Sequence, residues 1–147
     1  SVKEATWSLL GAVAMVGLSE RVAYPADGLD HVDVVDDQVG LPTFAGDLAA
    51  GVLHLLDAGA AYGTYDLTGA GEPASWREVA RLVFDACNGN GEAVRPVSTR
   101  DYHARAEGPV APRPASSTLD LARIQATGLT PTDWRDGLKQ YMRQLRS

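Results

Sequence analysis

The sequence is poor in cysteine and has no apolar run of membrane-spanning length. Its single cysteine, Cys87, cannot form a disulfide within the chain, and such low use of cysteine suits a reducing, cytoplasmic compartment. The apolar residues 9–18 make up only about half of the roughly 20 residues that a transmembrane helix needs. They also lack the basic flank and cleavage site of a signal peptide. We therefore expect no membrane partner.

Basic residues are outnumbered. The chain has 13 lysines and arginines against 19 aspartates and glutamates, which gives a formal net charge of −6. Because binding to nucleic acid requires a basic face, nucleic acid is not expected as the main partner. An anionic small molecule remains compatible with this charge, since one or two well-placed arginines can hold it locally.

The usual catalytic arrangements are missing as well. Lys3 and Lys139 are the only lysines, and neither follows a tyrosine at the Tyr-x-x-x-Lys spacing with which short-chain reductases donate a proton. Three scattered histidines and one cysteine do not suggest a zinc site, and no nucleophile elbow is present. Asp36 and Asp37 are expected on opposite faces of a strand, which disfavours a shared-proton pair. The sequence therefore predicts no catalytic centre in this chain and no metal site.

What is present is an ordinary globular composition. The 147 residues are 45% hydrophobic and 22% charged, enough for one domain with a real core. The chain begins at Ser1, which suggests a cut or processed piece of a longer protein. The sequence pattern is least clear in residues 1–31. There we expect a helix from about Glu4 to Leu18 and then a loop.

Residues 32–59 predict a buried strand followed by a helix. The β-branched Val32, Val34 and Val35 fit the strand, which Gly40 and Pro42 interrupt. We expect the helix to start at Thr43 and end near Gly59, with His54 on its surface. Its predicted buried face consists of Leu48, Val52, Leu55 and Leu56.

The middle of the chain alternates strands with a strongly patterned helix. Residues 64–68 and 93–97 are strand candidates. Between them, Ser75 and Glu78 form a capping box at the start of a helix. The core-facing stripe predicted for this helix is Trp76, Val79, Ala80, Val83, Phe84 and Cys87.

The last third predicts an irregular stretch and two more helices. Residues 104–118 are polar and interrupted by prolines. Asp120 is expected to cap a short helix that ends at Gly128, and Thr130 to cap the last helix with Pro131 at its first position. The predicted core stripe of that last helix is Trp134, Leu138, Tyr141, Met142 and Leu145. These patterns predict an α/β fold with a few partly parallel strands and four to five helices.

One stretch formally matches a dinucleotide-binding fingerprint. Residues 69–74 read G-x-G-x-x-A between a predicted strand and a predicted helix. Pro73 removes a backbone donor from the would-be phosphate cradle, and Ser75 already caps the helix. No second strand ending in an acidic residue follows at the expected distance. We therefore expect no cofactor to bind here.

A binding constellation remains. Gln38 and Thr43 flank a Gly-Leu-Pro turn at the end of the first strand, where open α/β sheets bind ligands. Arg113 and Ser117 add a guanidinium and a hydroxyl, which suit a phosphate and a sugar or base. The alternative interpretation is an ordinary capped turn and a surface arginine in a loop.

Two stretches carry a family resemblance. Asp37-Gln38-Val39-Gly40-Leu41-Pro42-Thr43 resembles the D-Q-x-G-x-P-T segment of dTDP-4-dehydrorhamnose reductases, which are extended short-chain reductases. Residues 113–120 are similar to the family's later R-P-x-x-S-x-L-D. Residues 63–67 with Ser75-Trp76 match G-x-Y-x-L…S-W, and residues 128–129 and 134–138 also fit. The resemblance runs from about Val32 to Leu145 in the right order and spacing.

The resemblance implies that residues 32–147 are the C-terminal, substrate-binding α/β portion of a Rossmann-like reductase. The whole enzyme would reduce the C4 ketone of a dTDP-linked 6-deoxy-4-ketohexose with NADPH, in dTDP-L-rhamnose biosynthesis. It assigns substrate binding to Gln38, Thr43, Arg113 and Ser117, and no catalytic role to any residue. The Gly-rich loop and the Tyr-x-x-x-Lys pair lie in an N-terminal Rossmann half without a counterpart here.

Without that half, this chain alone is expected to bind no cofactor and to be inactive. Its parallel strands would leave an apolar sheet edge open to self-association into a homo-oligomer. Two alternatives remain. One is a non-catalytic regulatory or scaffold module related to these reductases. The other is a sugar-nucleotide epimerase or dehydratase of the same superfamily, against which the two motifs argue.

Overall fold

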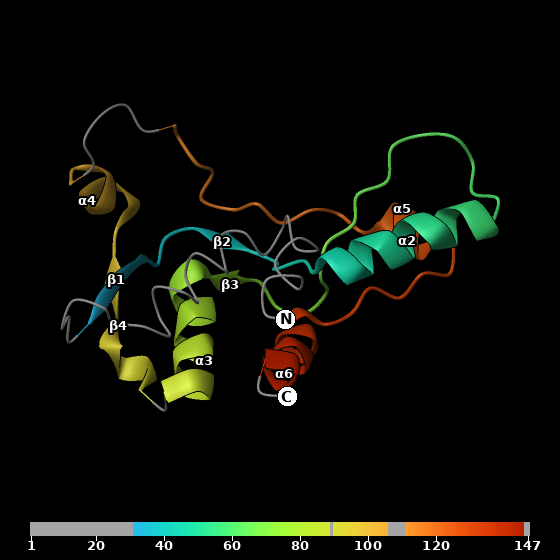
Figure 1. Ribbon diagram of the computed structural model, residues 1–147. Coiled ribbons are helices and arrows are strands. Elements are labelled where there is room, and N and C mark those ends of the chain that lie inside the picture. Colours follow the sequence, from blue (N-terminus) through green and yellow to red (C-terminus); the bar gives the residue numbers. More distant parts are fainter. Residues whose placement is uncertain (1–30, 89, 106–110, 146–147) are drawn as a thin grey trace. The chain divides into compact units, whose positions relative to one another are not determined.

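The computed structural model describes residues 31–88, 90–105 and 111–145, which belong to two compact units (Figure 1). We call residues 31–40 and the described part of 73–118 the strand unit, and residues 41–72 and 119–145 the helical unit. The predicted helix at Glu4–Leu18 lies outside the described residues. The boundary predicted at residues 31 and 32 stays a prediction.

The strand unit is built on a parallel pair of strands, β1 (Val32–Val35) and β4 (Val94–Val97). They pair from Val32 opposite Val94 to Val35 opposite Val97, as the prediction of two parallel strands required. Helix α3 (Trp76–Asn88) packs on both strands (Figure 1). The valines and the helix close a small apolar core, whose buried members are Val34, Ala74, Val79, Ala80, Val83, Phe84, Val94 and Val97.

Helix α3 follows its sequence pattern closely, with one exception. The Ser75 hydroxyl accepts the backbone N–H of Glu78 at 3.1 Å, so the predicted cap is present. Most of the predicted stripe is buried. Cys87 is exposed, however, so the prediction that it fills the core is wrong. It lies in the last turn of α3.

Four short elements complete the strand unit. β2 (Val39–Gly40) pairs antiparallel with β3 (Ala74–Ser75), and the 3-10 helix η2 (Gly91–Ala93) leads into β4. Helix α4 (Thr99–His103) follows β4, and Ser98 caps it by accepting the backbone N–H of Asp101. The sequence interpretation missed α4, because five residues are too few to show a helical period.

In the helical unit, α2 spans Ala45–Asp57 and departs from its prediction in two ways. It begins after Phe44 instead of at Thr43, whose hydroxyl donates to the carbonyl of Leu41. Two of the four residues of its predicted apolar face are exposed, with Val52 58% and Leu56 71% accessible, and the other two are half-buried. The buried position of α2 is Gly51, which is in close contact with Leu67, and the half-buried Leu48 and Leu55 lie on the same face of the helix. The helix therefore buries only this side of its predicted stripe.

His54 also departs from the prediction of a surface position. Its ring Nε2 lies 3.1 Å from the carbonyl and 3.0 Å from the hydroxyl of Thr127, so it ties α2 to the end of α5. Residues 64–68 form no strand, contrary to prediction. A strand needs a hydrogen-bonding neighbour, and the pairing in this part of the unit is an isolated bridge between Ala70 and Asp133.

Helices α5 (Ala122–Gln125) and α6 (Trp134–Leu145) complete the helical unit. Asp120 accepts the backbone N–H of Ala122 at 2.8 Å, but the cap position is Leu121 and not Asp120 as predicted, and α5 ends at Gln125, before the predicted Gly128. The cap predicted at Thr130 is wrong, because α6 begins four residues later and Asp133 accepts the backbone N–H of Arg135.

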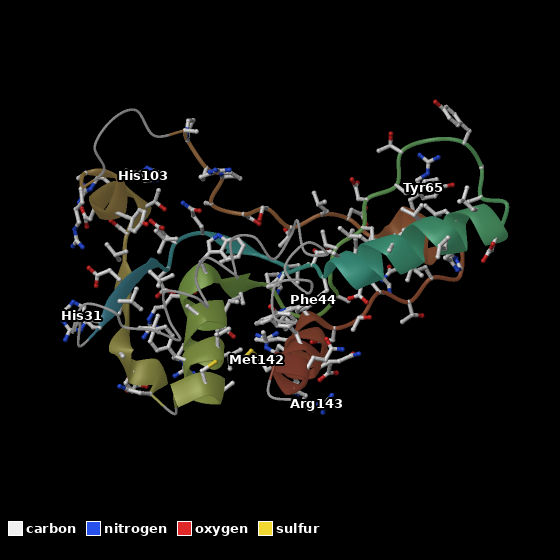
Figure 2. All side chains as sticks on the ribbon, in the orientation of Figure 1. His31, Phe44, Tyr65, His103, Met142 and Arg143 are labelled. Atoms are coloured by element: carbon white, nitrogen blue, oxygen red, sulfur yellow. The ribbon has the colours of Figure 1, made fainter. Side chains whose placement is uncertain are left out.

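The core of this unit centres on Trp134, which is fully buried and donates its indole N–H to the carbonyl of Glu72 at 2.9 Å. Phe44 lies beside α6 in Figure 2, with its ring centroid 6.4 Å from that of Tyr141 and its edge against Gly137. Burial raises the pKa of Tyr141. Among the residues that the structure describes, no helix is long and apolar enough to span a membrane.

Candidate functional site

The two family-like stretches meet at β2. Val39 donates its backbone N–H to the carbonyl of Ala115 at 2.8 Å, and its own carbonyl accepts the N–H of Ser117 at 2.9 Å. These two bonds make a parallel bridge between Val39 and Ser116. Val39 is also paired with Ser75 of β3, so the three segments lie side by side within the strand unit. Segments more than 70 residues apart thus form one small surface.

The predicted site residue Ser117 sits next to Gly40. Its hydroxyl donates to the carbonyl of Val39 at 3.2 Å. A Cβ at Gly40, which is buried, would lie 2.6 Å from that hydroxyl oxygen. The glycine of the D-Q-x-G pattern therefore leaves the space that the Ser117 side chain occupies.

Gln38 and Asp37 both reach Thr99, the first residue of α4. The Asp37 carboxylate accepts the backbone N–H of Thr99 at 2.9–3.0 Å and its hydroxyl at 2.5 Å. These hydrogen bonds lower the pKa of Asp37 below its ordinary value of 3.8. The Gln38 side-chain amide donates to the Thr99 hydroxyl oxygen at 2.8 Å. Gln38 is half-buried.

Asp36 does not share the partner of Asp37. Its carboxylate accepts the Ser75 hydroxyl at 2.5 Å and lies 3.9 Å from the Arg77 guanidinium. Asp36 and Asp37 lie in the bend after β1 instead of on the predicted strand, and they engage different neighbours, Ser75 and Thr99. Asp36 therefore has a structural role at the start of α3, and Asp37 has one at the start of α4.

Arg113 lies two residues before Ala115, at the start of the segment that pairs with β2. It is exposed and makes no hydrogen bond or ion pair with a described residue of the strand unit. Its guanidinium is therefore available to an anion from solution. Of the four predicted site residues, three (Gln38, Arg113 and Ser117) lie in the strand unit.

The fourth predicted residue, Thr43, lies in the helical unit and has a visible structural role. Besides its bond to Leu41, its hydroxyl accepts the backbone N–H of Gly69 at 3.2 Å. It therefore fixes the turn before α2 against the 69–71 loop. A ligand contact by Thr43 stays a prediction.

Thr99 is the site residue that the sequence interpretation missed. The signal was available, because Ser98 and Asp101 have the spacing of a helix cap directly after the third predicted strand. The C-terminal ends of parallel strands lie at one edge of a sheet, so a cap after β4 is expected near the end of β1.

The G-x-G-x-x-A stretch does not fit a cofactor phosphate. Gly71 has a φ of +103° and lies directly against the Asp133 carboxylate, and Ala70 pairs with Asp133 through the backbone. A carboxylate at this place repels a diphosphate, and Ser75 occupies the start of α3. This stretch therefore does not fit the phosphates of NADPH. Nor does the described part of the chain hold three or more metal-ligating side chains close enough to bind a metal ion.

Comparison with known proteins gives consistent results. Residues 17–147 match the family described as RmlD substrate binding domain. Over 115 residues the chain is 41% identical to the dTDP-4-dehydrorhamnose reductase of Mycolicibacterium smegmatis, covering 78% of this chain and 33% of that protein. The chain therefore spans about a third of that relative's length.

Solved structures agree. The chain is similar to a dTDP-4-dehydrorhamnose reductase from Clostridium acetobutylicum, with a TM-score of 0.73 and 30% identity over 88% of this chain and 44% of that one. It is also similar to the dTDP-4-dehydrorhamnose reductase of Bacillus anthracis in complex with NADP, with a TM-score of 0.68 and 26% identity over 86% of this chain and 42% of that one. The α/β fold is thus the one that these reductases contain.

Proposed function

The chain belongs to the family of RmlD substrate-binding domains, and from this we propose that it is the dTDP-sugar-binding portion of an NADPH-dependent dTDP-4-dehydrorhamnose reductase. In this role it binds a dTDP-linked 6-deoxy-4-ketohexose while the C4 ketone of that sugar is reduced. NADPH is held by residues outside the described part of the chain, because the G-x-G-x-x-A stretch does not suit its phosphates.

One observation carries the proposal. The backbone of Val39 bonds to Ala115 and Ser117, so the segment that bears Gln38 and the segment that bears Arg113 lie together in one unit. Nothing in their sequence separation requires this contact. A surface made of an amide, a hydroxyl and a free guanidinium suits a nucleoside diphosphate, which offers both anionic and neutral polar groups.

The chemistry gives this portion a positioning task. Hydride transfer to a ketone requires the sugar to be fixed against the cofactor, and binding of the remote nucleoside diphosphate can supply the free energy for that orientation. Arg113 carries the charge complementary to the diphosphate. Gln38 and Ser117 are neutral and suit the base or a sugar, and Thr43 remains a candidate contact.

Isothermal titration of dTDP into the 147-residue chain tests the proposal. We expect saturable binding, and we expect Arg113→Ala to weaken it by roughly tenfold or more, since hydrogen bonds to charged groups contribute about 1.5–3 kcal/mol. The matched control is Arg143→Ala, which removes an exposed arginine of α6 (Figure 2) and should leave the affinity unchanged. Absence of saturable binding, or equal loss in both variants, would contradict the proposal.

A further inference from the structure

Asp37, Thr99 and Gln38 form a directed chain of hydrogen bonds in the strand unit. The Thr99 hydroxyl lies 2.5 Å from Oδ1 of Asp37 and 2.8 Å from the side-chain nitrogen Nε2 of Gln38. A hydroxyl has one hydrogen to donate and accepts through its lone pairs. How that hydrogen is used determines what Gln38 can offer to a ligand.

Asp37 takes the hydrogen. An ionised carboxylate can only accept, and the hydrogen bonds from Thr99 keep the pKa of Asp37 below 3.8, so it is ionised at neutral pH. The Thr99 hydroxyl therefore donates to Asp37 and meets Gln38 as an acceptor. It follows that Gln38 turns its NH₂ group toward Thr99.

The opposite orientation of the Gln38 amide is unfavourable. It would place Oε1 against the Thr99 oxygen, so two acceptors would face each other without a hydrogen between them. With Nε2 held by Thr99, Oε1 is the remaining polar atom. It makes no hydrogen bond to a described residue of the strand unit.

We propose that Asp37 and Thr99 are positioning residues that fix the Gln38 amide, so that its carbonyl oxygen accepts a hydrogen bond from an N–H or O–H group of the bound nucleotide. This inference rests on the proposed function. An ionised diphosphate offers acceptors alone, so Gln38 does not contact it, and that contact is left to Arg113. The donor is the thymine imide N–H or the deoxyribose 3′-hydroxyl.

The first test is a double-mutant cycle on dTDP affinity. Thr99→Val removes the hydroxyl at nearly constant shape and should weaken binding about fivefold, the effect of one neutral hydrogen bond. Thr99→Ser restores the hydroxyl and should restore the affinity. In the Gln38→Ala background, Thr99→Val should have no further effect, because Thr99 acts through Gln38. An undiminished effect in that background would overturn the inference.

Ligand analogues identify the donor. N3-methyl-dTDP lacks the imide N–H, and 3′-deoxy-dTDP lacks the 3′-hydroxyl. One of the two should bind the wild-type chain about fivefold more weakly than dTDP and lose that disadvantage in Gln38→Ala. If neither analogue differs from dTDP in the wild-type chain, Gln38 does not accept from the nucleotide and the inference is overturned.

The side-chain NH₂ resonances of Gln38 test the orientation without a ligand. In the wild-type chain and in Thr99→Ser, the two amide protons should be well separated and slow to exchange, and in Thr99→Val they should move toward free-glutamine values. Unchanged resonances in Thr99→Val would overturn the inference. If the wild-type chain binds no dTDP while these resonances respond as expected, the proposed function and the ligand contact fail and the orientation stands.

Discussion

Gly40 shows how one missing side chain shapes the surface between the two family-like stretches. Gly40→Ala would place a Cβ 2.6 Å from the Ser117 hydroxyl and force it away from the Val39 carbonyl. We expect this substitution to lower the free energy of unfolding by about 1 kcal/mol, the net contribution of one hydrogen bond. Urea unfolding followed by circular dichroism measures the change.

A second glycine provides the control. Gly46 lies in α2, is exposed and has nothing within 4 Å of the place where a Cβ would stand. Gly46→Ala should therefore stabilise the chain by roughly 0.5–1 kcal/mol through helix propensity. In a Ser117→Ala background, Gly40→Ala should have little further effect, because the obstructing oxygen and the hydrogen bond that it makes are both already gone. Equal effects of the two glycine substitutions would refute the steric explanation.

The titration of Asp37 reports on the same surface. Because its pKa is lowered by bonds from Thr99, the stability that these bonds provide is fully present above the unfolded value and is lost as the pH falls through the folded value. Thr99→Val removes the largest of these contributions, so the pKa of Asp37 should rise toward 3.8. Carboxyl ¹³C chemical shifts measure it. An unchanged pKa would mean that the hydroxyl does not donate to Asp37.

At the scale of whole elements, the clearest lesson comes from comparing α3 with α2. The capping residues and apolar period of α3 predicted both its start and its buried face, because a cap and a period are local properties. The period of α2 was equally regular, yet Val52 and Leu56 are exposed. A period shows that a helix has an apolar side but not whether another element covers it.

The difference between the buried face of α6 and the exposed residues of α2 can be tested with one leucine from each helix. Leu138 of α6 is 5% exposed and Leu56 of α2 is 71% exposed. Leu138→Ala should cost roughly 2–5 kcal/mol of unfolding free energy, since it leaves a cavity, whereas Leu56→Ala should change it by less than about 0.5 kcal/mol. Chemical denaturation of the two variants measures both changes in the free energy of unfolding. A comparable loss in both would show that the apolar stripe of α2 is buried after all.

On the scale of the whole molecule, the sequence located the candidate surface but not the hydrogen bonds within it. The motifs around Gln38 and Ser117 predicted that distant stretches share a function, and the bridge at Val39 brings those stretches together. The cap spacing of Ser98 and Asp101 was visible in the sequence, but the bonds of Thr99 to Asp37 and Gln38 form only when β4 lies beside β1. Such contacts depend on strand pairing over more than 60 residues, which local patterns do not encode.

The proposed function as one part of a reductase predicts what this chain should not do alone. Reduction of a ketone needs a bound hydride donor and a proton donor beside the developing alkoxide. The G-x-G-x-x-A stretch does not suit the phosphates of NADPH, and Lys139, one of only two lysines, is paired with Asp136 at 2.9 Å. We therefore expect no oxidation of NADPH when the 147-residue chain is mixed with dTDP-4-dehydrorhamnose, as followed by absorbance at the nicotinamide band.

Joining the chain to the remainder of a homologous reductase supplies the contrast. A chimera in which this chain replaces the matching third of the Mycolicibacterium smegmatis protein should oxidise NADPH in the presence of the substrate. In that chimera Arg113→Ala should raise KM by roughly tenfold with a smaller change in kcat, because Arg113 is assigned to nucleotide binding and not to the reacting carbon. Turnover by the isolated chain, or a loss confined to kcat, would contradict the division of labour between the two parts.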